Sequence, residues 1–120
     1  MTKRTLVLGA SLKPERYSNI AIHRLKRNHH EVKAFGLKSG EVSNVEIDTE
    51  LLDYEDIDTV TLYLNPTRQK DYYDYIVDLK PDRVIFNPGK ENPEFYTILD
   101  ACGIAYEAAC TLVLLGTGQY

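Results

Sequence analysis

Apolar residues along this chain fall into short runs that are separated by polar segments. The first run, Thr5 to Leu8, is β-prone and has no helical period, which is typical of a strand covered on both faces. The β-branched and aliphatic run from Thr59 to Leu64 predicts a central strand. Shorter runs predict strands at residues 31–35, 83–86 and 104–107, and a short strand at 45–47 is compatible with the pattern.

Segments with helical spacing lie between these runs. They predict helices at residues 18–26, 66–80 and 94–102, with Ser18 or Asn19 capping the first and Gly103 ending the last. Cys102 falls on the apolar side of the last helix, so we expect it in the core. Alternating strands and helices indicate an α/β fold with right-handed crossovers and a mostly parallel, five-stranded sheet.

Length and composition limit the class of protein. The 120 residues predict a single domain spanning 1–120, and 43% hydrophobic with 27% charged residues is the balance of a water-soluble globular chain. Because no signal-peptide pattern or membrane-spanning run is visible, a cytoplasmic location without membrane contact is predicted. The net charge of −4 argues against a protein that coats nucleic acid.

The turn after the first strand is the main candidate for binding chemistry. Gly9, Ala10 and Ser11 allow close approach to the backbone, and a helix N-terminus follows. Free N–H groups and the positive end of the helix dipole suit a phosphate or pyrophosphate. Lys13 and Arg16 add positive charge. Alternatively, the small residues have a structural role alone, because the first turn of any such fold needs them whether or not it binds a ligand.

Special residues also follow the other predicted strands. Gly36 to Lys38 come after the second, Asn65-Pro66 after the third and Asn87 to Gly89 after the fourth. Because the carboxyl ends of parallel strands share one edge, these turns predict a binding cleft there. Dinucleotide-binding domains carry an acidic residue after the second strand, and here Lys38 lies there instead. This favours a ligand with an additional phosphate over NAD. A glycine-flanked surface turn with a solvated lysine fits the pattern equally well.

Catalytic and metal chemistry is not indicated. No acid–base pair, activated nucleophile or metal-ligand spacing can be assembled, so we expect no catalytic residues and no metal. His29 and His30 are interpreted as solvated turn residues. Cys102 and Cys110 lack zinc or redox spacing, and burial of Cys110 is preferred over a reactive role.

Taken together, the motifs resemble the small single-domain CoA-binding proteins, stand-alone relatives of the nucleotide-binding domain at the N-terminus of the succinyl-CoA synthetase α subunit. The resemblance covers nearly the whole chain. It rests on Val7-Leu-Gly-Ala-Ser11, the loop from Lys13 and Pro14 through Arg16 to Tyr17-Ser18, Val32–Lys38, Asn65-Pro66, Asn87–Gly89 and Cys110. Family members often have a proline in the turn after the second strand, where this chain reads Phe35-Gly36-Leu37-Lys38.

The resemblance implies a Rossmann-like three-layer sandwich that binds coenzyme A. Gly9, Ala10, Ser11 and Ser18 would hold the phosphates. Lys13 and Lys38 would supply counter-charges, and Tyr17 would lie beside the ligand. Pro66 and Gly89 would wall the pantetheine end. Ligase activity is not implied, because the synthetase's phosphorylated histidine comes from a further domain.

The leading hypothesis is therefore non-catalytic binding of CoA or acyl-CoA. One alternative is an NAD(P)-binding or other nucleotide-binding module. Another is an interaction protein with a vestigial cleft, whose surplus tyrosines between residues 72 and 75 would form a homodimer.

Overall fold

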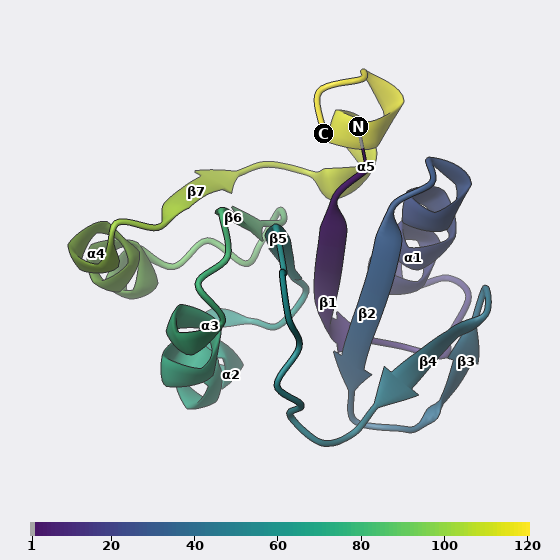
Figure 1. Ribbon diagram of the computed structural model, residues 1–120, viewed down its shortest axis with the longest axis horizontal. Coiled ribbons are helices and arrows are strands. Elements are labelled where there is room, and N and C mark those ends of the chain that lie inside the picture. Colours follow the sequence, from purple (N-terminus) through teal and green to yellow (C-terminus); the bar gives the residue numbers. More distant parts are fainter. Residues whose placement is uncertain (1) are drawn as a thin grey trace.

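A single mixed sheet organises the chain, and the computed structural model describes residues 2–120 (Figure 1). Among these residues seven strands are paired in the order β3-β4-β2-β1-β5-β6-β7, and every pair is parallel except β3 with β4. The strands are β1 (Arg4–Ala10), β2 (Glu31–Gly36), β3 (Gly40–Val42), β4 (Val45–Asp48), β5 (Thr59–Leu62), β6 (Arg83–Phe86) and β7 (Ala105–Ala108).

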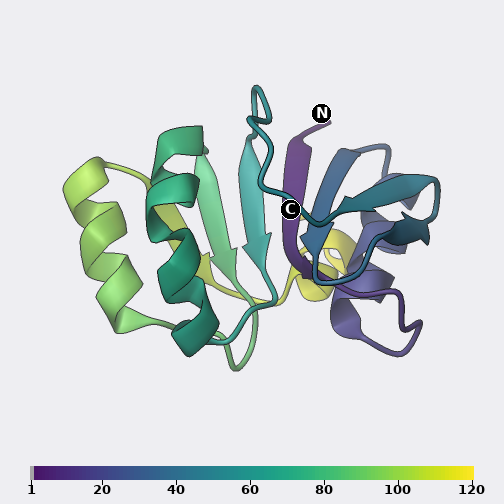
Figure 2. The same cartoon turned by 90° about the horizontal axis from the view of Figure 1, so that it is seen from below.

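Helices lie on both faces of this sheet (Figure 2). They are α1 (Tyr17–Arg27), α2 (Pro66–Gln69), the 3₁₀ turn η1 (Lys70–Tyr72), α3 (Tyr73–Leu79), α4 (Pro93–Cys102) and α5 (Thr111–Gly116). The predicted α/β class with a mostly parallel sheet is confirmed. Within residues 2–120, none of the helices has the length and apolar character needed to cross a membrane.

The side chains of β1 pack against helices on both faces of the sheet. Leu6 and Leu8 pack into a cluster with α3 and α4, whereas Val7 packs into a second cluster with α1 and α5. All three side chains are fully buried, as expected when successive side chains of a strand point to opposite faces. Because β1, β2, β5 and β6 are parallel, their carboxyl ends lie at one edge, and their arrows point the same way in Figure 2.

The predicted strand number of five is wrong because a hairpin extends the sheet beyond β2. Strands β3 and β4 are joined by Ser43 and Asn44, whose φ angles are +51° and +65°. Positive φ at both central residues is typical of a type I′ turn, the tightest way to join two antiparallel strands. Val42, Val45 and Ile47 are buried by the hairpin. The short strand expected at residues 45–47 is present as β4, whereas the sequence does not predict β3.

The predicted helix at 66–80 is interrupted by η1, and its tyrosines pack inside the chain. The Tyr73 ring stacks on Phe95 with 4.4 Å between centroids, and Tyr72 meets Phe35 edge-on at 5.6 Å. These contacts account for the surplus aromatic residues without a second subunit, and a homodimer stays a prediction.

Cys102 is exposed, so the prediction that it lies in the core is wrong. It is the last residue of α4.

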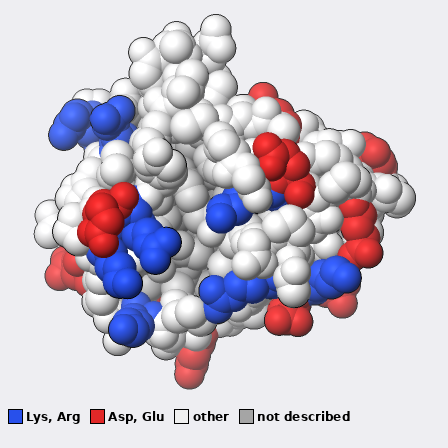
Figure 3. Space-filling model, turned by 180° about the vertical axis from the view of Figure 1, so that it is seen from behind, with Lys and Arg blue, Asp and Glu red and all other residues white. Residues whose placement is uncertain are grey.

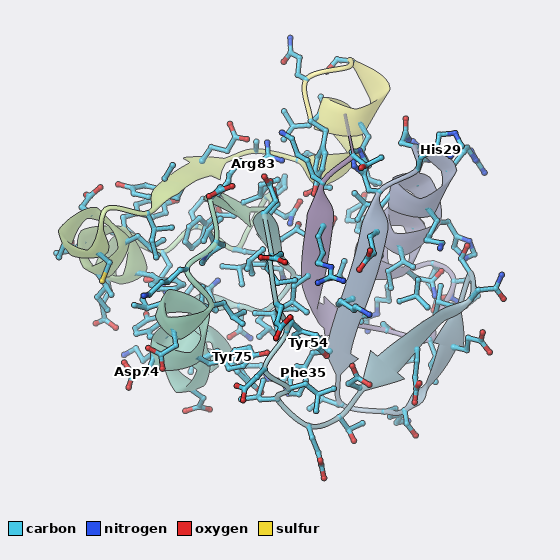
Figure 4. The ribbon with its side chains drawn as sticks, in the orientation of Figure 1. His29, Phe35, Tyr54, Asp74, Tyr75 and Arg83 are labelled. Atoms are coloured by element: carbon cyan, nitrogen blue, oxygen red, sulfur yellow. The ribbon has the colours of Figure 1, made fainter. Side chains whose placement is uncertain are left out.

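His30 is buried, which corrects its interpretation as a solvated turn residue, whereas His29 is exposed (Figure 4). The Nδ1 atom of His30 accepts a hydrogen bond from the backbone N–H of Lys3 at 2.9 Å, and its ring lies 4.9 Å from that of Tyr120. Burial, and then the positive charges of Lys3 and Arg83, lower the pKa of His30 below 6.5. The folded protein therefore prefers neutral His30.

We expect this histidine to make the protein less stable as pH falls. Above pH 6.5 it is neutral in both states. Below that value the unfolded chain binds the proton more readily, so the free energy of unfolding decreases until the lower folded pKa is passed. Urea unfolding of His30→Gln at pH 7 and 5.5 should show a weaker pH dependence than the wild type. His23→Gln, on the exposed side of α1, should keep the wild-type dependence; equal curves for the two variants would contradict the assignment.

Candidate functional site

The turn after β1 is held by two close backbone approaches. Gly9 has a φ of +95°, and a Cβ there would lie 3.0 Å from the carbonyl carbon of Tyr63. The pairing of β1 with β2 shifts at this point, so that Ala10 rather than Gly9 pairs with Gly36. A Cβ on Gly36 would lie 2.3 Å from the carbonyl oxygen of Ala10. Both glycines are thus required by the path of the first turn.

Helix α1 begins directly after this turn. Its N-cap is Arg16, which makes no side-chain capping bond, and its first turn contains no acidic residue. The predicted capping role of Ser18 or Asn19 is wrong, because both are buried within the helix. Asn19 instead donates from Nδ2 to the carbonyl oxygen of Ser11 at 2.9 Å. The amino end of α1 is therefore anchored to the small-residue turn while its N–H groups stay free of side-chain caps.

A cleft of about 710 Å³ lies at this edge of the sheet. It is lined by the segments that follow β1, β2, β5 and β6, in agreement with the predicted meeting of these turns. Its volume lies within the usual range of small-molecule sites. Of the nine residues that the resemblance assigns to the ligand, seven line it: Gly9, Ala10, Ser11, Lys13, Tyr17, Ser18 and Lys38. Pro66 and Gly89 do not line the cleft, but residues close to them in sequence do.

Those neighbours are Arg68 and Lys90, which the sequence interpretation missed. They line the cleft together with Lys13, Arg16 and Lys38, whereas Glu15 is its one acidic lining residue. Figure 3 shows several Lys and Arg side chains on the face that it views, with Asp and Glu side chains among them. Because the whole chain has a net charge of −4, this excess of cations is local to the cleft, and it favours an anionic ligand.

Apolar side chains provide the other part of the lining. Phe35, labelled near the lower end of β2 in Figure 4, lines the cleft with Leu64 and Tyr72. At its rim, Tyr17 is 71% exposed and Leu37 68% exposed. Exposed apolar groups beside cations suit a ligand that has both charged and uncharged parts.

A buried amide network fixes the segments that carry Arg68 and Lys90. Gln69 is fully buried and donates from Nε2 to the carbonyl oxygens of Leu64 and Lys90, at 2.8 and 2.9 Å. Its Oε1 accepts from Nδ2 of Asn92 at 2.8 Å. Every polar atom of the Gln69 side chain is thus engaged, which is what keeps a buried amide in place.

Asn87 has a structural role beneath the same edge. Its Nδ2 donates to Oγ1 of Thr61 at 2.7 Å and to the carbonyl oxygen of Leu62 at 2.9 Å. Its Oδ1 accepts from the backbone N–H of Thr111 at 2.9 Å. Asn87 therefore joins β6 to β5 and to the start of α5, and its fully used side chain has no donor left for a ligand.

The described part of the chain has few side chains near the cleft that could act as a nucleophile or a metal ligand. Residues 2–120 contain no cluster of three or more His, Cys, Asp or Glu side chains placed to hold a metal ion. Tyr63 lines the cleft, but its hydroxyl is buried without a hydrogen-bond partner, and burial raises the pKa of this phenol. Cys110 is half-buried rather than enclosed.

The chain is similar to known proteins over almost its whole length. A family model described as a CoA binding domain matches residues 3–116. Among curated proteins, no sequence matches. A crystal structure of an uncharacterized protein is 48% identical, with a TM-score of 0.97, and the match covers 100% of this chain and 99% of that one.

Two further solved structures are similar to this chain. A hypothetical protein from Pyrococcus horikoshii OT3 is 27% identical, with a TM-score of 0.83 over 93% of this chain and 80% of its own. Cell-free ID.343 from Thermus thermophilus is 23% identical, with a TM-score of 0.86 over 99% of this chain and 91% of its own. The latter likeness shows the shared fold alone.

Proposed function

The chain belongs to the CoA binding domain family, and on this basis we propose that its cleft binds coenzyme A or an acyl-CoA as a non-catalytic, single-domain module. The observation that carries the proposal is the charge of the cleft, where five cations and one acidic residue line a cavity in an otherwise acidic chain. Coenzyme A contains a pyrophosphate and a ribose 3′-phosphate, and these match Lys13, Arg16 and Lys38 of this lining.

The pyrophosphate would lie against the first turn and the amino end of α1. Gly9, Ala10 and Ser11 allow the ligand to approach the backbone, and the N–H group of Ser18 belongs to the uncapped first turn of the helix. Lys13 and Arg16 are in reach of the same region because they line the cleft beside it. Tyr17 offers an exposed ring next to the bound ligand.

The nucleoside half would extend toward β2. In dinucleotide-binding folds the residue at the end of this strand contacts the ribose, and an acidic side chain there selects NAD. Here the cleft is lined at that point by Lys38 and contains no acidic residue from β2 or its following turn. A lysine suits the 3′-phosphate of coenzyme A and leaves the ribose hydroxyls of NAD without their usual acceptor.

Isothermal titration calorimetry tests this function directly. The purified protein is titrated in parallel with CoA, 3′-dephospho-CoA, NAD and NADP at one salt concentration. We expect saturable binding of CoA and weaker binding of both dephospho-CoA and NAD, because each of these two contains a pyrophosphate but lacks the additional ribose phosphate of CoA. Tighter binding of NAD or NADP than of CoA would replace the proposal with a nicotinamide-nucleotide module. No binding of any of the four would favour an interaction protein with a vestigial cleft.

A further inference from the structure

Arg68 and Lys90 lie on the side of the cleft that the nucleotide half of coenzyme A would not reach. Lys13 and Arg16 belong to the segment after β1 and Lys38 to the segment after β2, whereas Arg68 is in α2 and Lys90 is in the β6–α4 loop. If the pyrophosphate lies at the first turn and the nucleoside extends toward β2, the opposite end of the ligand extends toward β5 and β6.

These two cations have no ionic partner in the described part of the chain. The ion pairs among residues 2–120 are Arg4–Glu31, Lys70–Glu94 and Arg83–Glu107. Lys70, two residues beyond Arg68, forms an ion pair with Glu94. The positive charges of Arg68 and Lys90, which line the cleft, are not neutralised by an ion pair within residues 2–120.

The backbone that carries both cations is held in place. Asn65 caps α2 by accepting a hydrogen bond from the backbone N–H of Arg68 at 2.9 Å. Gln69 then joins this helix to the carbonyl oxygen of Lys90, and Asn92 holds Gln69 from the far side. A buried network thus fixes the two segments that carry these cations, and both side chains line the same cleft.

The pantetheine arm of coenzyme A does not explain this pair, because its amides and thiol are uncharged. An anion at this end has to belong to what the thiol carries. We infer, on the basis of the function proposed above, that Arg68 and Lys90 recognise a carboxylate at the far end of an acyl group, so that the preferred ligands are CoA thioesters of dicarboxylic acids. The apolar side chains of Leu64 and Tyr72 line the same side of the cleft and suit the methylene part of such an acyl group.

The test compares glutaryl-CoA, which ends in a carboxylate, with valeryl-CoA, which has the same chain length and a methyl end. We expect the wild type to bind glutaryl-CoA about tenfold more tightly, the ordinary effect of a charge-assisted hydrogen bond. In the double variant Arg68→Gln/Lys90→Gln this ratio should fall to about one. The ratio is the readout because any weakened attraction to the phosphates that both thioesters share cancels in it.

Lys70→Gln is the matched control, because it removes a cation from the neighbouring turn that does not line the cleft; the wild-type ratio should persist. Equal binding of the two thioesters by the wild type would overturn the inference while leaving CoA binding intact. A double variant that kept the tenfold ratio would also overturn the inference. So would a double variant that bound CoA and 3′-dephospho-CoA equally, because that result would assign Arg68 and Lys90 to the ribose phosphate. If the wild type bound no CoA compound, the proposed function itself would fail.

Discussion

Gly36→Ala is expected to destabilise the protein and to abolish CoA binding together. The added Cβ would lie 2.3 Å from the carbonyl oxygen of Ala10, a backbone atom that no rotamer change can move away. Either β2 shifts away from β1 or the first turn is displaced. Overpacking of this kind costs about 1–3 kcal/mol, which corresponds to a fall in melting temperature of roughly 5–15 °C. A displaced first turn would also lose its fit to a pyrophosphate.

Differential scanning fluorimetry and calorimetric titration with CoA measure the two effects. Gly116→Ala is the matched control, because a Cβ at Gly116 meets nothing within 4 Å and its φ is not in the left-handed region. This control should melt within a few degrees of the wild type and bind CoA normally. A Gly36→Ala variant with wild-type melting temperature and affinity would show that the first turn tolerates a different path.

Ser11→Asp is expected to eliminate CoA binding without unfolding the chain. The Oγ of Ser11 accepts a hydrogen bond from the backbone N–H of Lys13 at 3.1 Å, and an aspartate oxygen can accept the same bond. The added carboxylate would lie beside the bound phosphates. Two like charges about 4 Å apart repel by about 4 kcal/mol at an effective dielectric constant near 20. That energy corresponds to roughly a thousandfold loss of affinity.

Ser11→Asn separates charge from shape. Asparagine has the size of aspartate and the same acceptor for Lys13, but no charge, so its CoA affinity should stay within about fivefold of the wild type. Calorimetric titrations of both variants with CoA give the comparison, and circular dichroism verifies the fold. Equal affinities for Asp and Asn variants would mean that the phosphates of CoA do not lie at the first turn.

The sequence predicts local features of this protein well and its long-range contacts poorly. The run from Thr5 to Leu8 and the following Gly9 identify β1 and its turn because strand pattern and turn chemistry are encoded in adjacent residues. The meeting of four turns at one edge also follows, because parallel strands impose it. The short strand predicted at 45–47 corresponds to β4, but β3 and the hairpin escape prediction because the Ser43-Asn44 turn lies in an acidic segment without strong alternation.

Two other features depend on residues that are distant in the sequence. His30 is buried by contacts with Lys3 and Tyr120, neither of which lies near it in the chain. Arg68 and Lys90 reach the same cleft only because Gln69 joins two loops. The sequence contains one hint of their role, because each cation follows an Asn-Pro pair within three residues. That both cations line the same cleft depends on the tertiary fold.

A crystal structure of the protein with coenzyme A measures most directly where the phosphates lie. The account predicts the pyrophosphate against the backbone of Gly9 to Ser11 and the first turn of α1, with the 3′-phosphate toward Lys38. Density for the ligand at another place, or a first turn filled by the protein's own side chains in crystals soaked with excess CoA, would contradict it.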